Sequence, residues 1–254
     1  MTTFITTPQG RHIAYSRTPG KEPGIVFLGG FKSDMTGSKA MHLQAWAESN
    51  GRAFVRFDYS GHGRSHGEFT DGAITDWFED ARALIEVLTE GPQILVGSSM
   101  GGWIALLLAR VLPERVCGLV GIASAPDFTE TIWETEFSTA DRARLLAEGQ
   151  VERPSAYSAD PYVITQRLIE DGRRNLVLDT PLSLPFPVRL LQGSADPDVP
   201  VARAMALFDH ATGPDIRLTL VKDADHRFST PACLGMITDM LEDILRGRAD
   251  AAGR

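Results

Sequence analysis

The chain has 254 residues, 43% of them hydrophobic, which is enough for one large domain with a buried core. Its 25 lysines and arginines stand against 33 aspartates and glutamates, so the net charge is −8, and the chain contains no basic run. These numbers disfavour nucleic acid and anionic membrane surfaces as partners, and no apolar stretch is long enough for stable membrane insertion.

Strands and helices alternate along most of the chain. The first element is a predicted hairpin around Pro8-Gln9-Gly10, whose strands at 3–7 and 11–15 belong to the fold, so we predict no cleaved leader. Six further apolar runs are predicted strands: 24–28, 53–57, 93–96, 116–122, 188–191 and 216–221. Five segments with helical spacing of apolar residues are predicted helices: 38–49, 74–88, 103–111, 201–208 and 231–245. This alternation predicts an α/β fold, with a mainly parallel eight-stranded sheet and helices on both faces.

Residues 127–186 break this rhythm and are too long for a plain loop in a compact domain. They include predicted helices at 139–146 and 161–170 and a predicted turn at Asp171-Gly172. We interpret the segment as a cap insertion over the strand ends, within an α/β core that consists of two stretches, residues 1–126 and 187–254. The tail after residue 245 is expected to fray. Four aromatic residues of the cap are candidates to contact a substrate, with packing of the cap onto the body as the alternative for each: Trp133, Phe137, Tyr157 and Tyr162.

The strand predicted at 93–96 leads into Gly97-Ser98-Ser99-Met100-Gly101, a Gly-x-Ser-x-Gly motif, and a predicted helix follows. Glycines at both ends let the strand and the helix approach while the central serine holds a strained backbone. This context is typical of a nucleophile elbow, which projects the hydroxyl of Ser99 above the sheet edge. Ser98 does not occupy the central position. The alternative is a tight turn with a solvent-facing serine.

A serine hydroxyl needs a base that takes its proton and a carboxylate that orients the base. Two acids, Asp196 and Asp198, follow the next-to-last predicted strand, and the Gly-x-x-Asp-x-x-Val-Pro register favours Asp196. His226 follows the last predicted strand, and it alone among the six histidines lies after the acid in a loop that follows a strand. The order of serine, acid and histidine along the chain is that of α/β-hydrolases.

The remaining candidate ligands give no metal or redox framework. His62 and His66 precede Ser99 in the chain, and their spacing matches no zinc pattern, so no metal site is predicted. Cys117 and Cys233 form no recognisable disulfide framework, which suits a reducing compartment. The predicted location is cytoplasmic.

The oxyanion of an acyl-transfer reaction needs backbone N–H donors that already point at it. Met100 supplies one donor, because it follows the serine and lies at the start of the helix, where the dipole favours negative charge. The second donor is expected from Gly29-Gly30-Phe31, after the strand at 24–28, where two glycines let the backbone approach a substrate. We predict that this donor is the N–H of Phe31.

Together these motifs resemble the α/β-hydrolase superfamily over nearly the whole chain. Residues 27–40, Phe-Leu-Gly-Gly-Phe-Lys-Ser-Asp-Met-Thr-Gly-Ser-Lys-Ala, are similar to the abhydrolase branch that includes a mitochondrial acyl-protein (palmitoyl) thioesterase, also described as an acyl-glucuronide esterase. The resemblance implies that Ser99 is the nucleophile, Asp196 the acid and His226 the base, and that esters or thioesters are hydrolysed without a cofactor. Gly29 departs from the pattern, since many hydrolases carry histidine before the second glycine.

Three functions stay open at this point. The favoured one is a serine hydrolase that cleaves carboxylic esters or thioesters through an acyl-Ser99 intermediate. A C–C bond hydrolase or an amidase would use the same triad, and a non-catalytic ligand receptor could share the fold. Serine in place of aspartate at position 99 disfavours a dehalogenase. The expected partner is a small-molecule or acylated substrate, and the sequence leaves the oligomeric state open.

Overall fold

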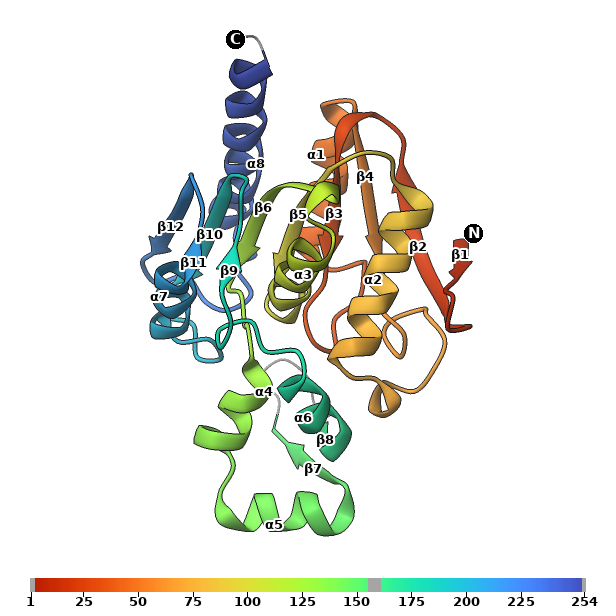
Figure 1. The fold of residues 1–254 in the computed structure, drawn as a ribbon, viewed down its shortest axis with the longest axis vertical. Coiled ribbons are helices and arrows are strands. Elements are labelled where there is room, and N and C mark those ends of the chain that lie inside the picture. The colour runs from red at the N-terminus through yellow and green to blue at the C-terminus, as the bar shows by residue number, and fades with distance from the viewer. Residues whose placement is uncertain (1–2, 155–160, 253–254) are drawn as a thin grey trace.

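The computed structural model describes residues 3–154 and 161–252, and an eight-stranded sheet forms its centre (Figure 1). The two edge strands at the N-terminal side pair antiparallel, and the other six strands run parallel. The predicted mainly parallel sheet of eight strands is therefore confirmed. In spatial order the strands are β1 (Thr3–Thr6), β2 (His12–Thr18), β4 (Arg52–Phe57), β3 (Lys21–Leu28), β5 (Gln93–Ser98), β6 (Val116–Ile122), β10 (Val188–Gly193) and β12 (Ile216–Val221).

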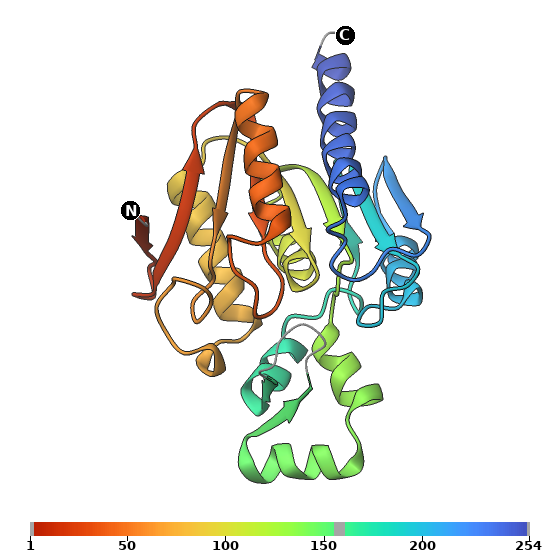
Figure 2. The ribbon, with the colours of Figure 1, turned by 180° about the vertical axis from the view of Figure 1, so that it is seen from behind.

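Helices cover both faces of this sheet, as predicted (Figures 1 and 2). One face carries α1 (Ser38–Ser49) and α8 (Pro231–Ala252), and the opposite face carries α2 (Ile74–Leu88), α3 (Met100–Val111) and α7 (Val201–His210). Successive side chains of a strand point to opposite faces. In β3, accordingly, Ile25 and Phe27 pack with α1 and α8, whereas Val26 and Leu28 join the core on the other face. Short 3-10 helices, η1 (Phe69–Asp71) and η2 (Pro113–Arg115), complete the body.

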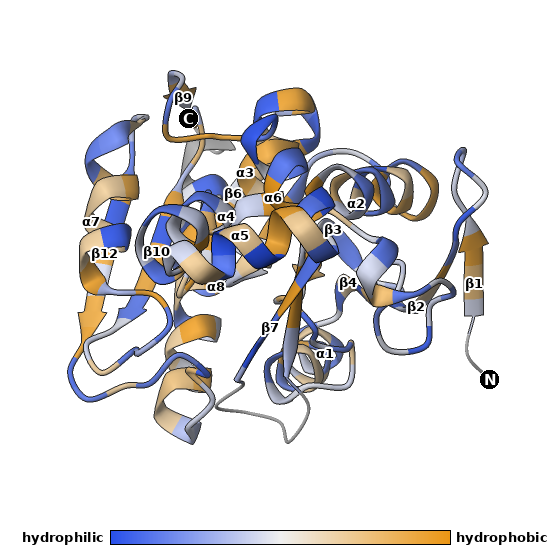
Figure 3. Ribbon diagram, turned by 90° about the horizontal axis from the view of Figure 1, so that it is seen from below, coloured by the Kyte–Doolittle hydropathy of each residue, from blue (hydrophilic) through white to orange (hydrophobic). Residues whose placement is uncertain are grey.

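The segment between β6 and β10 lies beyond the carboxyl ends of the central strands (Figure 1). Seen from that side, α5 overlaps the middle of the sheet (Figure 3). Its elements are α4 (Phe128–Thr131), the π-helix η3 (Ile132–Glu136), α5 (Thr139–Glu148), β7 (Gln150–Arg153), β8 (Tyr162–Thr165), α6 (Gln166–Arg173) and β9 (Leu182–Ser183). The segment returns to the body through β9, which pairs with β11 (Ala211–Thr212). It therefore covers the sheet edge at which ligands of open α/β sheets bind.

Three local predictions are wrong. The helix predicted at 161–170 begins only at Gln166, because the β-branched run of β8 pairs antiparallel with β7 and Thr165 caps the helix through a 3.1 Å hydrogen bond from the N–H of Leu168. The predicted turn at Asp171-Gly172 consequently lies inside α6. Residues 246–252 of the tail are helical instead of frayed, since α8 continues to Ala252 and the Arg248 guanidinium donates to the carbonyl of Cys117. None of the helices within the described ranges combines the length and apolarity needed to cross a lipid bilayer.

Candidate active site

Ser99 lies at the junction of β5 and α3 with φ 54° and ψ −119°, a conformation that non-glycine residues rarely adopt. Its N–H donates to the carbonyl of Ile122 at 2.9 Å, and its own carbonyl accepts from the N–H of Ala125 at 3.1 Å. A Cβ on Gly97 would collide with the backbone of Gly101, and one on Gly101 would collide with the carbonyl of Leu28. Both glycines of the motif are therefore required by the close approach of strand and helix.

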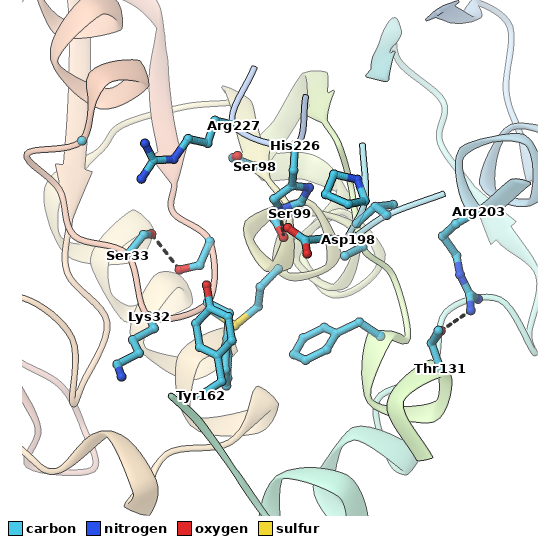
Figure 4. Close-up of a pocket in the computed structure, with 18 of the residues that line it drawn as sticks. Lys32, Ser33, Ser98, Ser99, Thr131, Tyr162, Asp198, Arg203, His226 and Arg227 are labelled. Carbon is cyan, nitrogen blue, oxygen red and sulfur yellow. Dashed lines mark hydrogen bonds between the residues drawn. The ribbon is translucent and has the colours of Figure 1, made fainter. Parts of the chain in front are cut away.

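The structure brings the three predicted side chains together above the carboxyl ends of β5, β10 and β12. His226 Nε2 lies 3.1 Å from Ser99 Oγ, and His226 Nδ1 lies 2.9 Å from Asp196 Oδ2. Ser99 and His226 meet at the cavity in Figure 4. This places Ser99, His226 and Asp196 in the geometry through which a hydroxyl proton can pass to the imidazole while a carboxylate fixes the ring.

The side chain of Asp196 is 0% exposed, and several hydrogen-bond donors hold its carboxylate in place. Its Oδ1 accepts from the N–H groups of Asp198 and Val199 at 2.9 and 2.8 Å, and its Oδ2 also accepts from Gln192 Nε2 at 3.0 Å. Burial acts to raise the pKa of Asp196, but the hydrogen bonds from His226 and the backbone outweigh it and hold this pKa below its ordinary value. Asp196 therefore stays ionised beside His226.

Asp198 is the other acid of the loop, and its side chain is exposed at the cavity wall. Asp196, Asp198 and His226 each bring one ligand-type atom within 4.8 Å of the others, a spacing that could hold a cation. Both oxygens of Asp196 accept hydrogen bonds, however, and His226 Nε2 faces Ser99 Oγ. The donor set thus fits a proton path better than a metal site.

The two predicted oxyanion donors belong to segments that lie next to Ser99. Met100 follows it as the first residue of α3, and the loop of Phe31 passes close by, since a Cβ on Gly30 would lie 3.4 Å from Ser99 Cβ. Within the described residues, neither the N–H of Phe31 nor that of Met100 donates to another protein group. Both are therefore available to a ligand oxygen.

A cavity of about 720 Å³ opens over Ser99, in the size range of small-molecule sites. Tyr162 reaches into it from β8 (Figure 4). Apolar residues from several elements line it, and the sequence did not single most of them out: Phe27, Met100, Phe128, Ile132 and Ile164. Basic side chains also line it, among them Lys32, Arg203 and Arg227.

Of the four aromatic candidates for substrate contact, Tyr162 is among the described residues that line the cavity. Trp133 and Phe137 are not among them. The guanidinium groups of Arg142 and Arg173 lie 5.4 and 4.9 Å from the centroid of the Trp133 ring, and Phe137 is only 5% exposed within the core. Trp133 thus packs against arginines of its own segment, and Phe137 packs into the core. Tyr157 lies outside the described residues.

The model of the hydrolase family described as serine aminopeptidase, S33, matches residues 24–230, which include Ser99, Asp196 and His226. The chain belongs to this α/β-hydrolase family. It is 36% identical over 243 residues to "Palmitoyl-protein thioesterase ABHD10, mitochondrial" of Rattus norvegicus, which covers 95% of this chain and 82% of the rat protein. The resemblance to the α/β-hydrolases and to their thioesterase branch is thereby confirmed, and the chain is a hydrolase.

Two solved structures share the whole fold with this hydrolase. The crystal structure of a protein from Agrobacterium vitis S4 superposes with a TM-score of 0.92 at 43% identity, covering 96% of this chain and 98% of that one. Alpha/beta hydrolase domain-containing protein 10 from mouse gives a TM-score of 0.90 at 33% identity, covering 97% and 99%. The α/β-hydrolase fold expected from the sequence is therefore confirmed over nearly the full length.

The predicted cytoplasmic location is wrong, because the rat relative and its mouse counterpart are both named mitochondrial. Cysteine usage could not have shown this. Buried free thiols such as Cys117 and Cys233 are compatible with any reducing compartment, so they do not choose among such compartments.

Proposed function

We propose that this hydrolase cleaves esters or thioesters of carboxylic acids through an acyl-Ser99 intermediate. The single observation that carries the proposal is the continuous hydrogen-bonded path from Ser99 Oγ through His226 to the buried carboxylate of Asp196. A backbone-strained serine with a base at 3.1 Å and available N–H groups beside it matches the requirements of acyl transfer.

In the first half of the reaction, Ser99 Oγ attacks the carbonyl carbon of the substrate while its proton passes to His226 Nε2. The carbonyl oxygen becomes an oxyanion that accepts from the N–H groups of Met100 and Phe31, and Asp196 stabilises the imidazolium. Collapse expels the alcohol or thiol, which leaves with the proton from His226. In the second half, His226 takes a proton from water, the resulting hydroxide attacks the acyl-Ser99 carbonyl, and the acid departs as Ser99 recovers its proton.

For the substrate, we propose an acylated thiol or alcohol whose acyl chain occupies the apolar part of the cavity. The apolar lining from Phe128, Ile132 and Ile164 supports this assignment, and so does the thioesterase name of the rat relative. Tyr162 would contact the substrate from the same strand as Ile164. We also propose that residues 127–186 act as a cap over a core of residues 1–126 and 187–254, because this segment supplies that lining.

A matched substrate panel tests the proposal. Purified wild-type protein is assayed with a thioester, an oxygen ester and an amide of the same acyl group, beside Ser99→Ala and Ser98→Ala. We expect hydrolysis of the thioester and the ester, loss of this activity in Ser99→Ala, and retention in Ser98→Ala. Preferential cleavage of the amide would favour the amidase alternative. Full activity of Ser99→Ala, or tight binding without turnover by the wild type, would contradict the proposal.

A further inference from the structure

The peptide group between Gly30 and Phe31 is fixed at its carbonyl end. The carbonyl oxygen of Gly30 accepts twice from Ser33, from the side-chain hydroxyl at 2.7 Å and from the backbone N–H at 3.2 Å. Figure 4 shows the hydroxyl contact at the cavity wall. Because the C=O and N–H of a trans peptide point in opposite directions, these two bonds also set the direction of the Phe31 N–H.

The next peptide group along the chain is fixed by a buried histidine. The N–H of Lys32 donates to His62 Nε2 at 3.2 Å, and Lys32 has a φ of 56°, in the left-handed region. A non-glycine residue in that region costs on the order of 1–3 kcal/mol, and such a conformation persists only where its surroundings determine it. The His62 acceptor is one such determinant, and it lies directly after Phe31.

The ring of His62 has one tautomer that satisfies its contacts. His62 Nδ1 lies 3.1 Å from the carbonyl of Ser60, which can only accept, so Nδ1 carries the proton and Nε2 offers its lone pair to Lys32. Burial lowers the pKa of His62 to about 4, against a smaller opposing effect of the Ser60 carbonyl, and so keeps the ring neutral. The ring also packs edge-on against Trp77 at 5.1 Å between centroids.

A buried carboxylate ties this histidine to the scaffold. Ser60 donates through its N–H and its hydroxyl to Asp80 Oδ2 at 2.9 and 2.6 Å, and Asp80 lies fully buried on α2. The same carbonyl of Ser60 that accepts from His62 also accepts from Trp77 Nε1 at 3.1 Å. A series of hydrogen bonds therefore connects Asp80 and Trp77 of α2, through Ser60 and His62, to the N–H of Lys32.

We propose that Ser33 and His62 are positioning residues that hold the Phe31 N–H in the direction required for oxyanion binding. The inference rests on the proposed function, because it concerns the donor that the acyl-transfer mechanism assigns to Phe31. Neither side chain acts on the substrate through this role. Each fixes one end of the short backbone stretch that contains the donor, so that the donor is already oriented before the oxyanion forms.

The test compares Ser33→Ala and His62→Phe with His62→Gln, whose side-chain oxygen can still accept from Lys32. Phe keeps the aromatic volume beside Trp77 and removes both ring nitrogens, so the contact with the Ser60 carbonyl is lost together with the acceptor for Lys32. Loss of an entire oxyanion donor typically lowers kcat by about 10²–10³-fold, so we expect each removal to lower kcat by roughly tenfold or more with KM nearly unchanged. Activity should recover largely in His62→Gln. Controls in the same two loops are Thr36→Ala and His66→Gln, both exposed and outside the cavity lining.

A second measurement separates positioning from a merely structural role. An alkyl boronic acid forms a tetrahedral adduct on the serine, and its affinity should fall by the same factor as kcat in Ser33→Ala and His62→Phe. Lower thermal stability with unchanged kcat and boronate affinity would overturn the inference alone. A wild-type protein that neither hydrolyses esters or thioesters nor binds the boronate would overturn the proposed function with it.

Discussion

Asp196 and Asp198 lie two residues apart, yet the fold gives them different surroundings. Asp196 accepts from His226 Nδ1 at 2.9 Å and has a lowered pKa, whereas the side chain of Asp198 is exposed. We expect Asp196→Asn to lower kcat by about 10³-fold or more, since an amide at this position cannot stabilise the imidazolium or select its tautomer. Asp198→Asn should lower kcat far less. Steady-state kinetics on both variants measures this, and a larger effect at Asp198 would contradict the assignment of the acid.

His62 gives a prediction on stability as a function of pH. Burial lowers its folded-state pKa to about 4 from the ordinary 6.5, so between these values the unfolded chain binds a proton that the folded chain does not. The stability that neutral His62 contributes is therefore complete above pH 6.5 and is lost as pH falls toward 4. The effect amounts to about 1.4 kcal/mol for each unit of pKa shift.

Denaturant unfolding across that pH window measures the effect. The free energy of unfolding of the wild type should fall more steeply with decreasing pH than that of His62→Phe. Parallel curves for the two proteins would show that the pKa of His62 is the same in the folded and unfolded chains, which would contradict the effect of burial.

The residues of the site could be predicted because each follows a strand whose apolar run is visible in the sequence. Ser99, Asp196 and His226 are separated widely along the chain, but parallel strands bring their carboxyl ends to one sheet edge. Ser33 and His62 were not predicted. Their roles depend on which backbone group each side chain meets, and no residue spacing encodes that contact.

Among the elements, the β5–α3 elbow has the strictest steric requirement. A Cβ on Gly101 would collide with the carbonyl of Leu28, which belongs to the adjacent strand and cannot rotate away. We expect Gly101→Ala to destabilise the fold by about 3 kcal/mol if the backbone relaxes in part, and by more if it does not relax. Gly235→Ala on α8 is the matched control, because a Cβ there meets no atom within 4 Å and alanine favours the helix by about 0.5–1 kcal/mol. Calorimetric Tm values that fall equally in both variants would contradict this account.

Two helices were predicted to the residue, since the ranges 38–49 and 74–88 coincide with α1 and α2. In α2 the buried apolar residues recur at helical spacing along the whole helix, which makes its period visible in the sequence. The prediction at 161–170 failed because the strand β8 exists only through its partner β7. Pairing between segments is a tertiary effect, and it overrides a local pattern of this length.

At the scale of the whole molecule, the cavity is assembled from parts that the sequence separates widely. Ile132, Tyr162 and Ile164 come from the segment between β6 and β10, whereas Phe27 and Met100 belong to the sheet and its helices. Sequence patterns indicated that the segment contains aromatic residues, but not which of them face inward. Trp133 and Phe137 were candidates for the lining, with packing as the alternative, and they pack among arginines and core residues.

The cavity also gives a prediction on acyl-chain length. Ile164 is buried and lines the cavity from β8, so Ile164→Trp should fill part of the space for an acyl chain. We expect kcat/KM to fall for long-chain thioesters and to stay near the wild-type value for acetyl thioesters. Val163→Trp, on the adjacent position of the same strand and outside the described lining, is the control. An equal loss for both chain lengths would show that the acyl group lies elsewhere.

The most direct test of the central claim is the site of covalent labelling. The wild-type protein is treated with a fluorophosphonate, and tandem mass spectrometry locates the adduct within the peptide that contains Ser98 and Ser99. The account predicts one adduct, on Ser99, that forms slowly in His226→Ala and is absent in Ser99→Ala. An adduct on Ser98, or no adduct on the folded wild-type protein, would contradict it.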